Sequence, residues 1–370
     1  MRITFTGEIG LNAADSKNPP FKGGKCKDGR DWERFGCSVA TEKNNRAYLE
    51  VMGTSGGDIK TMDTDNNKIT ISWADRNDPD IIKAVASYKK HVVNLGDERK
   101  EFITDYDFIQ YLKENVDRLK GKFTITGQSQ SNVYQGKISQ RFQIQNIYAA
   151  TEDTKNALKV TTEYFFNKES IDTADWAEEK KVTINGYISS YIAEEKKNMF
   201  VPLTIVFDCA KIDFTDEHYV NLCKAKLGMI GCELNDGKVK CKLKGTGFYS
   251  MAVILAYVNG SERVEFTEDM LTDTQREFIE LGLKKLEDFR PAGAVYGERT
   301  TMYKLINFDL NTINKKDYSD GYIDTEMSEE DFMDNVYVPI KEESVDDVIT
   351  ETKKPEAKPV VDDDDDDLFS

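Results

Sequence analysis

Aromatic and basic side chains alternate with apolar ones on two neighbouring segments, and this spacing predicts a surface for base stacking and phosphate binding. Trp32 and Arg34 share one side of the first segment, and Arg46 and Tyr48 share one side of the second. The opposite side is apolar in both segments: Phe35, Cys37 and Val39 in the first, and Ala47, Leu49 and Val51 in the second. Period-two alternation is typical of strands with one buried face. Exposed aromatic rings stack on bases, and guanidinium groups bind phosphates.

The elements that must position these side chains are strands joined by tight turns. The stretch TEKNNR at 41–46 predicts a turn, so the two segments should form a hairpin. A third strand is expected over 68–74, with Trp73 on its core side and Lys68 on its outer side. Helical spacing follows over 81–92, and Thr104 with Asp107 predicts the start of a helix that runs to Leu119. Strands resume at 122–127 and at 141–148.

Three strands, a helical connection and two strands follow the order of an OB-fold, a small β-barrel whose open face binds oligonucleotides. We therefore expect residues 1–150 to form an OB-fold-like domain that binds single-stranded DNA, with bases stacked on Trp32 and Tyr48. The phosphate-binding side chains would be Arg34, Lys43, Arg46, Lys68 and Arg141, with Lys22, Lys25, Lys27 and Arg30 reaching over the edge. The alternative is an ordinary solvated sheet face, which most antiparallel sheets have.

Residues 151–310 predict a second OB-like domain. Strand patterns at 181–192, 200–207 and 238–258 surround a predicted helix near 215–227, and Thr272 with Gln275 predicts a helix reaching Phe289. A last strand at 301–310 would close this domain. The fold class is therefore mainly β with helices, as two OB-like barrels.

The third segment, residues 311–370, is predicted to be a disordered acidic tail. Residues 301–370 contain 7 Lys and Arg against 21 Asp and Glu, which accounts for −14 of the formal net charge of −17. The chain ends in six aspartates, Leu368, Phe369 and Ser370. Unpaired carboxylates cannot be buried, but two apolar residues after them can enter a partner's pocket. We predict that Asp362, Asp363, Asp364, Asp365, Asp366, Asp367, Leu368 and Phe369 bind partner proteins. A short amphipathic patch at 332–338 is a candidate second docking peptide.

Other chemistry has little support in the sequence. The nucleotide-loop, GxGxxG and HExxH patterns are absent, and the two histidines, His91 and His218, lie far apart. A hairpin could bring Cys26 close to Cys37, and the later four cysteines could likewise approach one another at a zinc site. The six form no CxxC pair, however, so buried reduced thiols are the preferred interpretation. We expect no enzyme activity and no cofactor. No apolar run is long enough to span a membrane and the N-terminus lacks a signal-peptide core, so we expect a cytoplasmic location without membrane association.

Two segments resemble the single-stranded DNA-binding proteins of phages and bacteria. KDGRDWERFGCSV at Lys27–Val39 is similar to the first hairpin of OB-fold DNA binders, and DDDDDDLF at Asp362–Phe369 resembles the family's acidic terminus. The family commonly ends on its aromatic residue, whereas Ser370 follows Phe369 here. The resemblance implies a protein that coats single-stranded DNA during phage or bacterial replication, recombination and repair, in the host cytoplasm if it is phage-encoded. Its acidic tail would compete with DNA and recruit a polymerase, helicase or primase, and self-association is possible for such a protein.

Two other classes of function fit the same sequence. One is a phage assembly protein that binds no DNA and uses the acidic tail to hold a partner. The other is a replication or recombination mediator that touches DNA weakly while loading an enzyme. The surface around Trp32 and Tyr48 distinguishes them, because only a coating protein needs that surface exposed.

Overall fold

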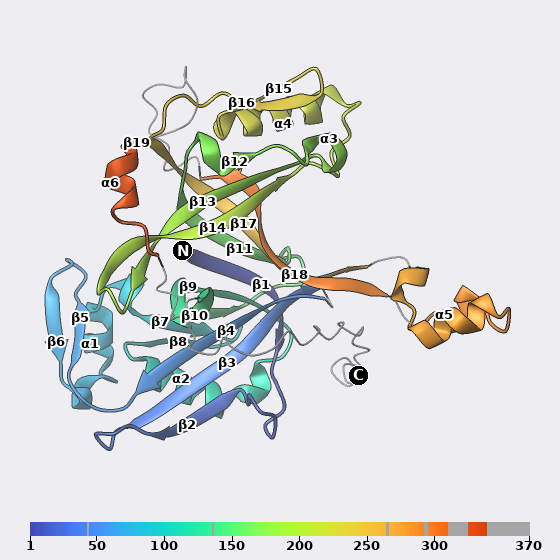
Figure 1. The fold of residues 1–370 in the computed structure, drawn as a ribbon. Helices are drawn as coiled ribbons and strands as arrows, with labels where there is room; N and C mark the ends of the chain where they lie inside the picture. Colours follow the sequence, from blue (N-terminus) through green and yellow to red (C-terminus); the bar gives the residue numbers. More distant parts are fainter. Residues whose placement is uncertain (43, 135–136, 264–265, 292–294, 310–324, 339–370) are drawn as a thin grey trace, which may run out of the picture. The chain divides into compact units, whose positions relative to one another are not determined.

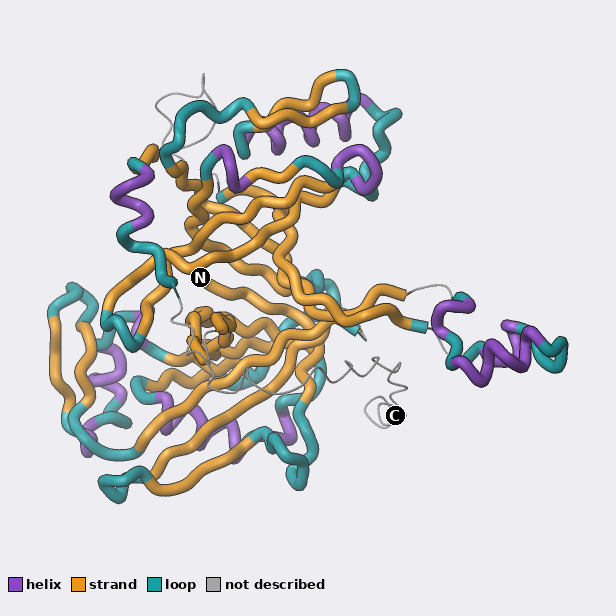
Figure 2. Tube along the Cα trace, viewed as in Figure 1, coloured by secondary structure: helices purple, strands orange, loops and turns teal. Residues whose placement is uncertain are grey.

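The structure is a computed structural model that describes residues 1–42, 44–134, 137–263, 266–291, 295–309 and 325–338. The chain forms two compact units. The first comprises residues 1–260 with 300–340, and the second comprises residues 261–299 with 341–370. Strands make up most of the first unit, and helices lie at its margins (Figure 2).

Five strands in the first half of the chain close into a ring: β1 (Arg2–Gly10), β3 (Asp31–Glu42), β4 (Asn45–Thr54), β9 (Lys122–Tyr134) and β10 (Lys137–Ala149). β1 pairs antiparallel with β3 and β9, β3 with β4, and β9 with β10. A parallel contact, Leu49 opposite Phe142, joins β4 to β10 and closes the ring. Phe35, Val39 and Ala47 are buried, so the apolar side of each predicted strand faces the interior.

The chain between β4 and β9 supplies the helix that covers one side of this ring. In α2 (Asp105–Glu114), Phe108 and Leu112 are fully buried, and the helix packs on β3 and β4. Thr104 begins the helix as predicted: its Oγ1 accepts a hydrogen bond from the Asp107 amide at 3.1 Å. The other elements of this connection are β5 (Ile59–Met62), β6 (Lys68–Ile71), η1 (Trp73–Asp75), α1 (Pro79–Ala84), η2 (Ser87–Lys89), β7 (His91–Asn94), β8 (Arg99–Phe102) and η3 (Val116–Arg118).

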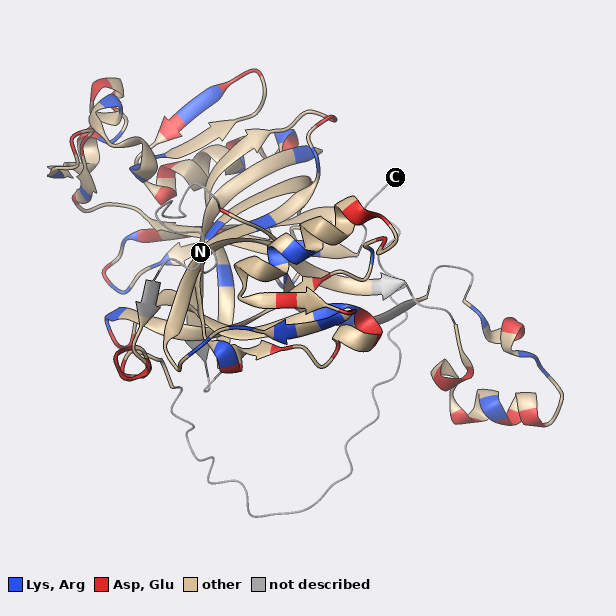
Figure 3. Cartoon of the chain, turned by 90° about the horizontal axis from the view of Figure 1, so that it is seen from above, with Lys and Arg blue, Asp and Glu red and all other residues tan. Residues whose placement is uncertain are grey.

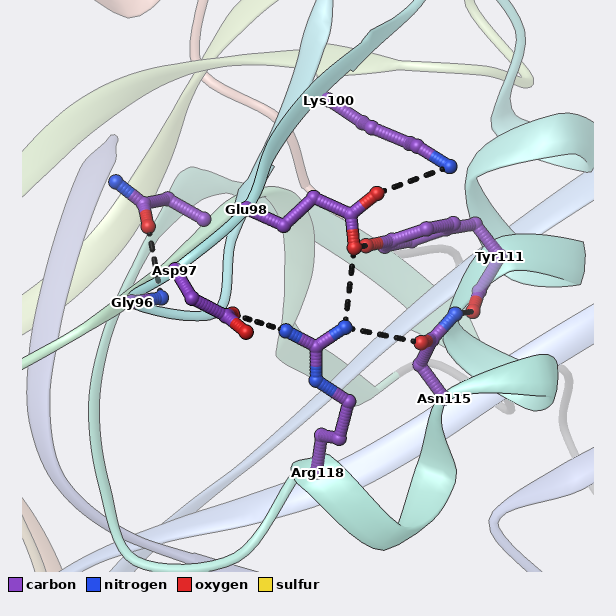
Figure 4. A network of polar contacts seen from close by, with 8 residues as sticks. Gly96, Asp97, Glu98, Lys100, Tyr111, Asn115 and Arg118 are labelled. Carbon is purple, nitrogen blue, oxygen red and sulfur yellow. Dashed lines mark hydrogen bonds and ion pairs between the residues drawn. The ribbon is translucent and has the colours of Figure 1, made fainter.

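A polar network links α2 and η3 to the turn between β7 and β8 (Figure 4). Glu98 accepts hydrogen bonds from Arg118 Nη1 and Tyr111 Oη, both at 3.1 Å, and forms an ion pair with Lys100. Arg118 also pairs with Asp97. These bonds, Arg118 foremost, hold the pKa of Glu98 below its ordinary value. The carboxylate form of Glu98 therefore stabilises the contact between the helix and the hairpin.

A second ring repeats this order: β11 (Ala157–Phe166), β13 (Lys181–Ile192), β14 (Lys197–Asp208), β17 (Phe248–Arg263) and β18 (Tyr296–Phe308). β11 pairs with β13 and β17, β13 pairs with β14, and β17 lies beside β18. The parallel contact is again between the third and fifth strands, Ile205 opposite Tyr303. Along the chain, α4 (Glu217–Met229) follows the third strand and precedes the fourth, as α2 does in the first ring. Its accessory elements are η4 (Lys168–Ser170), β12 (Ile171–Asp172), α3 (Trp176–Glu179), β15 (Cys232–Asn235), β16 (Lys238–Cys241), β19 (Thr325–Met327) and α6 (Glu329–Met333).

The two rings share one sheet and one apolar core. β1 pairs antiparallel with β11 in the register Ile3 opposite Val160, so the first strands of the two rings lie side by side (Figure 1). Tyr257 of β17 packs on Phe5 and Phe142 of the first ring and on Tyr303 of the second. The apolar interior is therefore continuous through both rings.

Gly7 lies where β1 exchanges β11 for β3 as its neighbour. A Cβ atom at this position would lie 2.1 Å from the Ala40 carbonyl oxygen, far inside van der Waals contact. β1 can thus change partners only because residue 7 carries no side chain.

The second ring buries a tyrosine hydroxyl among backbone groups. Tyr164 Oη accepts a hydrogen bond from the Gly186 amide at 2.7 Å, and it lies 2.8 Å from the Ile184 carbonyl and 2.7 Å from the Leu203 carbonyl. Burial raises the pKa of Tyr164, so the hydroxyl stays protonated and donates to one of these carbonyls. The side chain thereby ties β11 to β13 and β14.

The second unit contains η5 (Glu268–Met270), α5 (Asp273–Glu280) and η6 (Leu286–Phe289). Thr272 and Gln275 form the predicted capping box. The helix predicted to run through to Phe289 is interrupted, however, because α5 ends at Glu280 and Gly282 follows with a φ of +69°. A left-handed residue of this kind typically ends a helix.

The mainly β class is confirmed, and the strand order within each ring is OB-like, but further local predictions are wrong. The segment 68–74 is not a ring strand: β6 pairs only with β5, and Trp73 lies in η1, half-buried beneath Arg76. The helix expected over 81–92 ends at Ala84, where the backbone of Val85 becomes extended, and Val92 pairs in β7 with β8 and β10. The tail expected to be disordered is ordered over 325–338, where β19 and α6 fold onto the second ring.

The division into three domains stays a prediction. The predicted boundary at residue 150 falls in the connection between β10 and β11. In the part of the chain that the structure describes, no helix combines the length and the apolar character needed to span a membrane.

Candidate nucleic-acid interface

The outer side of β2 (Phe21–Lys25), β3 and β4 brings together most of the predicted binding residues, and we call it the β2–β4 face. The pairing register places Lys22 beside Arg34 and Arg34 beside Met52. One row further along, Gly24 lies beside Trp32. The face is completed by Glu50, Tyr48 and Arg46 on β4, and by Arg141 and Gln143 on β10, which pairs with β4.

The two predicted stacking residues differ in exposure. Tyr48 is 53% exposed and lies opposite the small residue Ser38, so nothing large stands beside it on β3. Trp32 is half-buried, and its indole lies over Gly24: a Cβ there would be 3.0 Å from Trp32 Nε1. Tyr48 therefore offers the more accessible ring, and β2 supports Trp32 from one side.

Three charged side chains at the middle of the face are coupled. Arg34 Nη1 lies 3.1 Å from Glu50 Oε2, and Arg141 Nη1 lies 3.7 Å from Glu50 Oε1. Arg34 also donates to the Pro19 carbonyl at 3.3 Å, and its side chain is only 24% exposed, against 61% for Arg141. Glu50 thus holds two guanidinium groups beside Tyr48 and neutralises one of their charges.

The predicted edge cations fall into two groups. Lys25 pairs with Asp31 at 2.6 Å, and Arg30 pairs with Asp28 at 2.8 Å. Arg30 lowers the pKa of Asp28 through its hydrogen bond. These pairs are exposed and therefore contribute little to folding stability, but each offsets a positive charge near the face. Lys22 and Lys27 are exposed.

The remaining predicted residues differ in their placement. Lys68 lies on the β5–β6 hairpin, in a sheet separate from the rings, so the predicted placement on the barrel face is wrong. Lys43 and the tail residues Asp362–Phe369 lie outside the described residues. Arg46 is half-buried at the start of β4, where its carbonyl accepts a hydrogen bond from Asn259 of the second ring.

The structure adds residues that the sequence prediction did not include. Met52 is 63% exposed beside Arg34, although an apolar side chain on a polar strand face normally avoids water. Gln143 of β10 donates to Gln130 of β9 at 3.0 Å and extends the polar surface around the ring. Met52 was detectable from the sequence, because it shares the period-two side of Tyr48 and Glu50.

Charge on the first unit is mixed. Figure 3 shows Lys and Arg interspersed with Asp and Glu along the strands. The β2–β4 face fits this picture, since Glu50 pairs with both Arg34 and Arg141, and Asp28 and Asp31 each pair with one cation near the face. Such a surface can bind a polyanion only where incoming phosphates compete with these carboxylates.

His91 and the cysteine pair Cys209 and Cys223 have structural surroundings, whereas His218 is exposed and Cys26 and Cys241 are half-buried. His91 Nδ1 lies 2.9 Å from the Gln145 carbonyl and Nε2 lies 3.1 Å from Asp105. Cys209 and Cys223 are buried with their Sγ atoms 3.3 Å apart. Among the described residues, no three or more His, Cys, Asp or Glu side chains are grouped so that they could hold a metal ion.

Comparison with known proteins gives a distant structural likeness. No family model matches the chain, and no curated protein matches it. Wild-type single-stranded DNA binding protein from Thermus aquaticus is similar over 70% of this chain and 84% of its own, with 8% identity and a TM-score of 0.28. A deletion mutant of that protein is similar over 70% of this chain and 86% of its own, with 10% identity and a TM-score of 0.29.

Proposed function

We propose that this protein binds single-stranded DNA without catalysis, through the β2–β4 face of its first ring. The observation that carries the proposal is an exposed Tyr48 and a supported Trp32 flanking the Arg34–Glu50–Arg141 cluster. Aromatic rings in this setting stack on any base, at about 1–3 kcal/mol per base, and the cations contact the backbone. Binding should therefore show little sequence preference.

In this proposal each ring is an OB-fold barrel, and the protein coats single-stranded DNA during replication, recombination or repair. The acidic terminus at Asp362–Phe369 competes with DNA for cations and recruits replication proteins. A phage or bacterial origin accords with the sequence resemblance at Lys27–Val39 and at this terminus.

Tryptophan fluorescence during titration with oligothymidine tests the interface. The chain has three tryptophans, Trp32, Trp73 and Trp176, and only Trp32 lies on the β2–β4 face. We expect quenching by DNA that survives Trp73→Phe and is lost in Trp32→Phe. Trp32→Phe should keep most of the affinity because it retains a ring, whereas Trp32→Ala should weaken binding about five-fold or more, the worth of one stacked base.

The controls decide between the interface and a general effect on the fold. Anisotropy of a labelled oligonucleotide measures affinity independently of tryptophan, and thermal unfolding confirms that each variant is folded. Equal affinity for wild type and Trp32→Ala, with quenching that follows Trp73 instead, would refute the proposed interface.

A further inference from the structure

The second ring holds a phenylalanine ring between two others. Phe332 of α6 stacks on Phe200 with centroids 4.1 Å apart and planes 13° apart, and on Phe248 at 3.8 Å and 9°. Tyr187 and Phe165 border the stack, with ring centroids 5.2 and 5.9 Å from Phe332. Phe332 is fully buried as a result. The slot between Phe200 and Phe248 is thus one flat ring thick, which is the shape that accepts a nucleobase.

The slot lies at the place on the second ring that corresponds to Tyr48 on the first. Tyr48 is the fourth residue of β4 and pairs with Ser38, while Phe200 is the fourth residue of β14 and pairs with Ser189. β4 and β14 are the third strands of their rings. The two rings therefore present an aromatic residue at equivalent positions, exposed in the first and covered in the second.

The covering segment, residues 325–338, combines an aromatic ring with negative charge. β19 pairs with the start of β17, the Phe200 amide donates to the Asn335 carbonyl at 2.8 Å, and the Tyr337 amide donates to the Phe200 carbonyl at 2.9 Å. Its carboxylates Glu329, Glu330, Asp331 and Asp334 are exposed around the buried ring. A stacked ring flanked by anions resembles a nucleotide strand in its flat ring and its negative charge.

We propose that the slot of Phe200 and Phe248 is a second base-stacking site for single-stranded nucleic acid, which residues 325–338 occupy while nucleic acid is absent. This inference rests on the proposed function. The outward residues that surround the slot on β13 and β14 are uncharged, among them Asn185, Ser189, Pro202 and Thr204. The site therefore binds through stacking, and its contribution depends weakly on salt.

Phe332→Ala in the full-length chain tests the inference. Emptying the slot should tighten binding of an oligothymidine long enough to reach both rings by about five-fold or more, the worth of one stacked base. The gain should persist at high salt and should disappear in Phe332→Ala/Phe200→Ala. Met333→Ala is the matched control, because Met333 is the exposed neighbour of Phe332 on the same helix.

The charge of the segment provides a separate control. Glu329→Gln/Glu330→Gln reduces its negative charge and keeps the ring, so it should give a smaller, salt-sensitive gain. A full gain in this variant with none in Phe332→Ala would overturn the slot and leave only electrostatic competition. If wild type binds through Trp32 and Phe332→Ala gains nothing, this inference alone is refuted. If no variant binds, the proposed function is refuted as well.

Hydrogen exchange on the wild-type chain gives a test that needs no variant. Saturating oligothymidine should speed exchange at the Phe200 and Tyr337 amides, whose partners lie across the contact between the segment and the ring. Amides paired between β9 and β1 serve as the control and should not change. Unchanged or slower exchange at Phe200 and Tyr337 would overturn the displacement.

Discussion

Glu50 lies between Arg34 and Arg141, and its replacement by glutamine tests whether these guanidinium groups meet phosphates. In the free protein the carboxylate is 3.1 Å from Arg34 Nη1 and 3.7 Å from Arg141 Nη1. An incoming phosphate must compete with it. Unit charges at this separation interact by about 1 kcal/mol in water and about 4 kcal/mol at an effective dielectric of 20. Because all three side chains are partly exposed, the lower figure applies, and Glu50→Gln should tighten binding about five-fold at low salt.

Salt dependence gives the sharper signature. Each phosphate neutralised on a single strand contributes about −0.7 to the slope of log K against log salt. Freeing one or two guanidinium groups should steepen that slope by about 0.7 to 1.4, so the advantage of Glu50→Gln shrinks by about 2.6-fold per contact between 50 and 200 mM salt. Anisotropy titrations of labelled oligothymidine at several salt concentrations measure both quantities.

The matched control is Glu114→Gln, which makes the same change of charge at the exposed end of α2. It reports the effect of net charge alone. Loss of the partly exposed pair with Arg34 should cost the fold no more than about 1 kcal/mol, which urea unfolding would verify. Parallel salt plots for wild type and Glu50→Gln, with equal affinities, would show that Arg34 and Arg141 do not contact the backbone of DNA.

Three further outcomes are expected. Tyr164→Phe should lower the free energy of unfolding by about 1–3 kcal/mol, because the buried Gly186 amide loses its acceptor; a urea midpoint equal to that of wild type would contradict this. Glu98 has a lowered pKa in the folded chain, so its stabilising contribution is present above its ordinary value of 4.5 and is lost as the pH falls through the lowered value. Glu98→Gln should therefore be less stable than wild type at neutral pH and should lose less stability on acidification; identical pH profiles of the urea midpoint would argue against the network. Deletion of 339–370 should tighten binding at low salt by removing a competing polyanion, and an unchanged affinity would leave the terminus a docking peptide only.

The first hairpin was predictable because its strands have one buried face. Alternation in 32–39 and 46–51 sets Phe35 and Val51 on one side, and the structure pairs these two residues directly. The start of α2 was also predictable, since the signal from Thr104 and Asp107 is local. In both cases the information lies within a few residues of the feature that it determines.

Long-range pairing left no such local signal. The parallel contact of Leu49 with Phe142 closes the first ring, yet nothing near either residue indicates its partner. Val92 fits the helical spacing of the preceding segment equally well, and its pairing with β8 and with the distant β10 makes it a strand residue. Trp73 alternates with apolar residues, but the strand ends at Ile71, so its ring rests at the surface under Arg76.

The candidate site shows the same limit. Alternation correctly placed Arg34, Tyr48 and Glu50 on one face of the hairpin. That Glu50 would engage Arg34 and also Arg141 depends on the pairing of β4 with β10, which lies far away in the sequence. Predicting residue types for a site is thus easier than predicting which of its charges are already paired.

Residues 325–338 show why composition misjudged part of the tail. An acidic segment cannot build its own core, but it can place one large ring into a surface that is already folded. Burying Phe332 contributes about 1.5–3 kcal/mol, whereas ordering each backbone residue costs about 1–2 kcal/mol. The ring alone therefore cannot hold the segment. The pairing of β19 with β17, the two hydrogen bonds at Phe200 and the burial of Tyr337 also hold it. If single-stranded DNA displaces the segment as proposed, we expect its net stability to be marginal. Marginal stability is the property that a replaceable occupant of a base-stacking slot requires, because a strand that stacks a single base there can displace it.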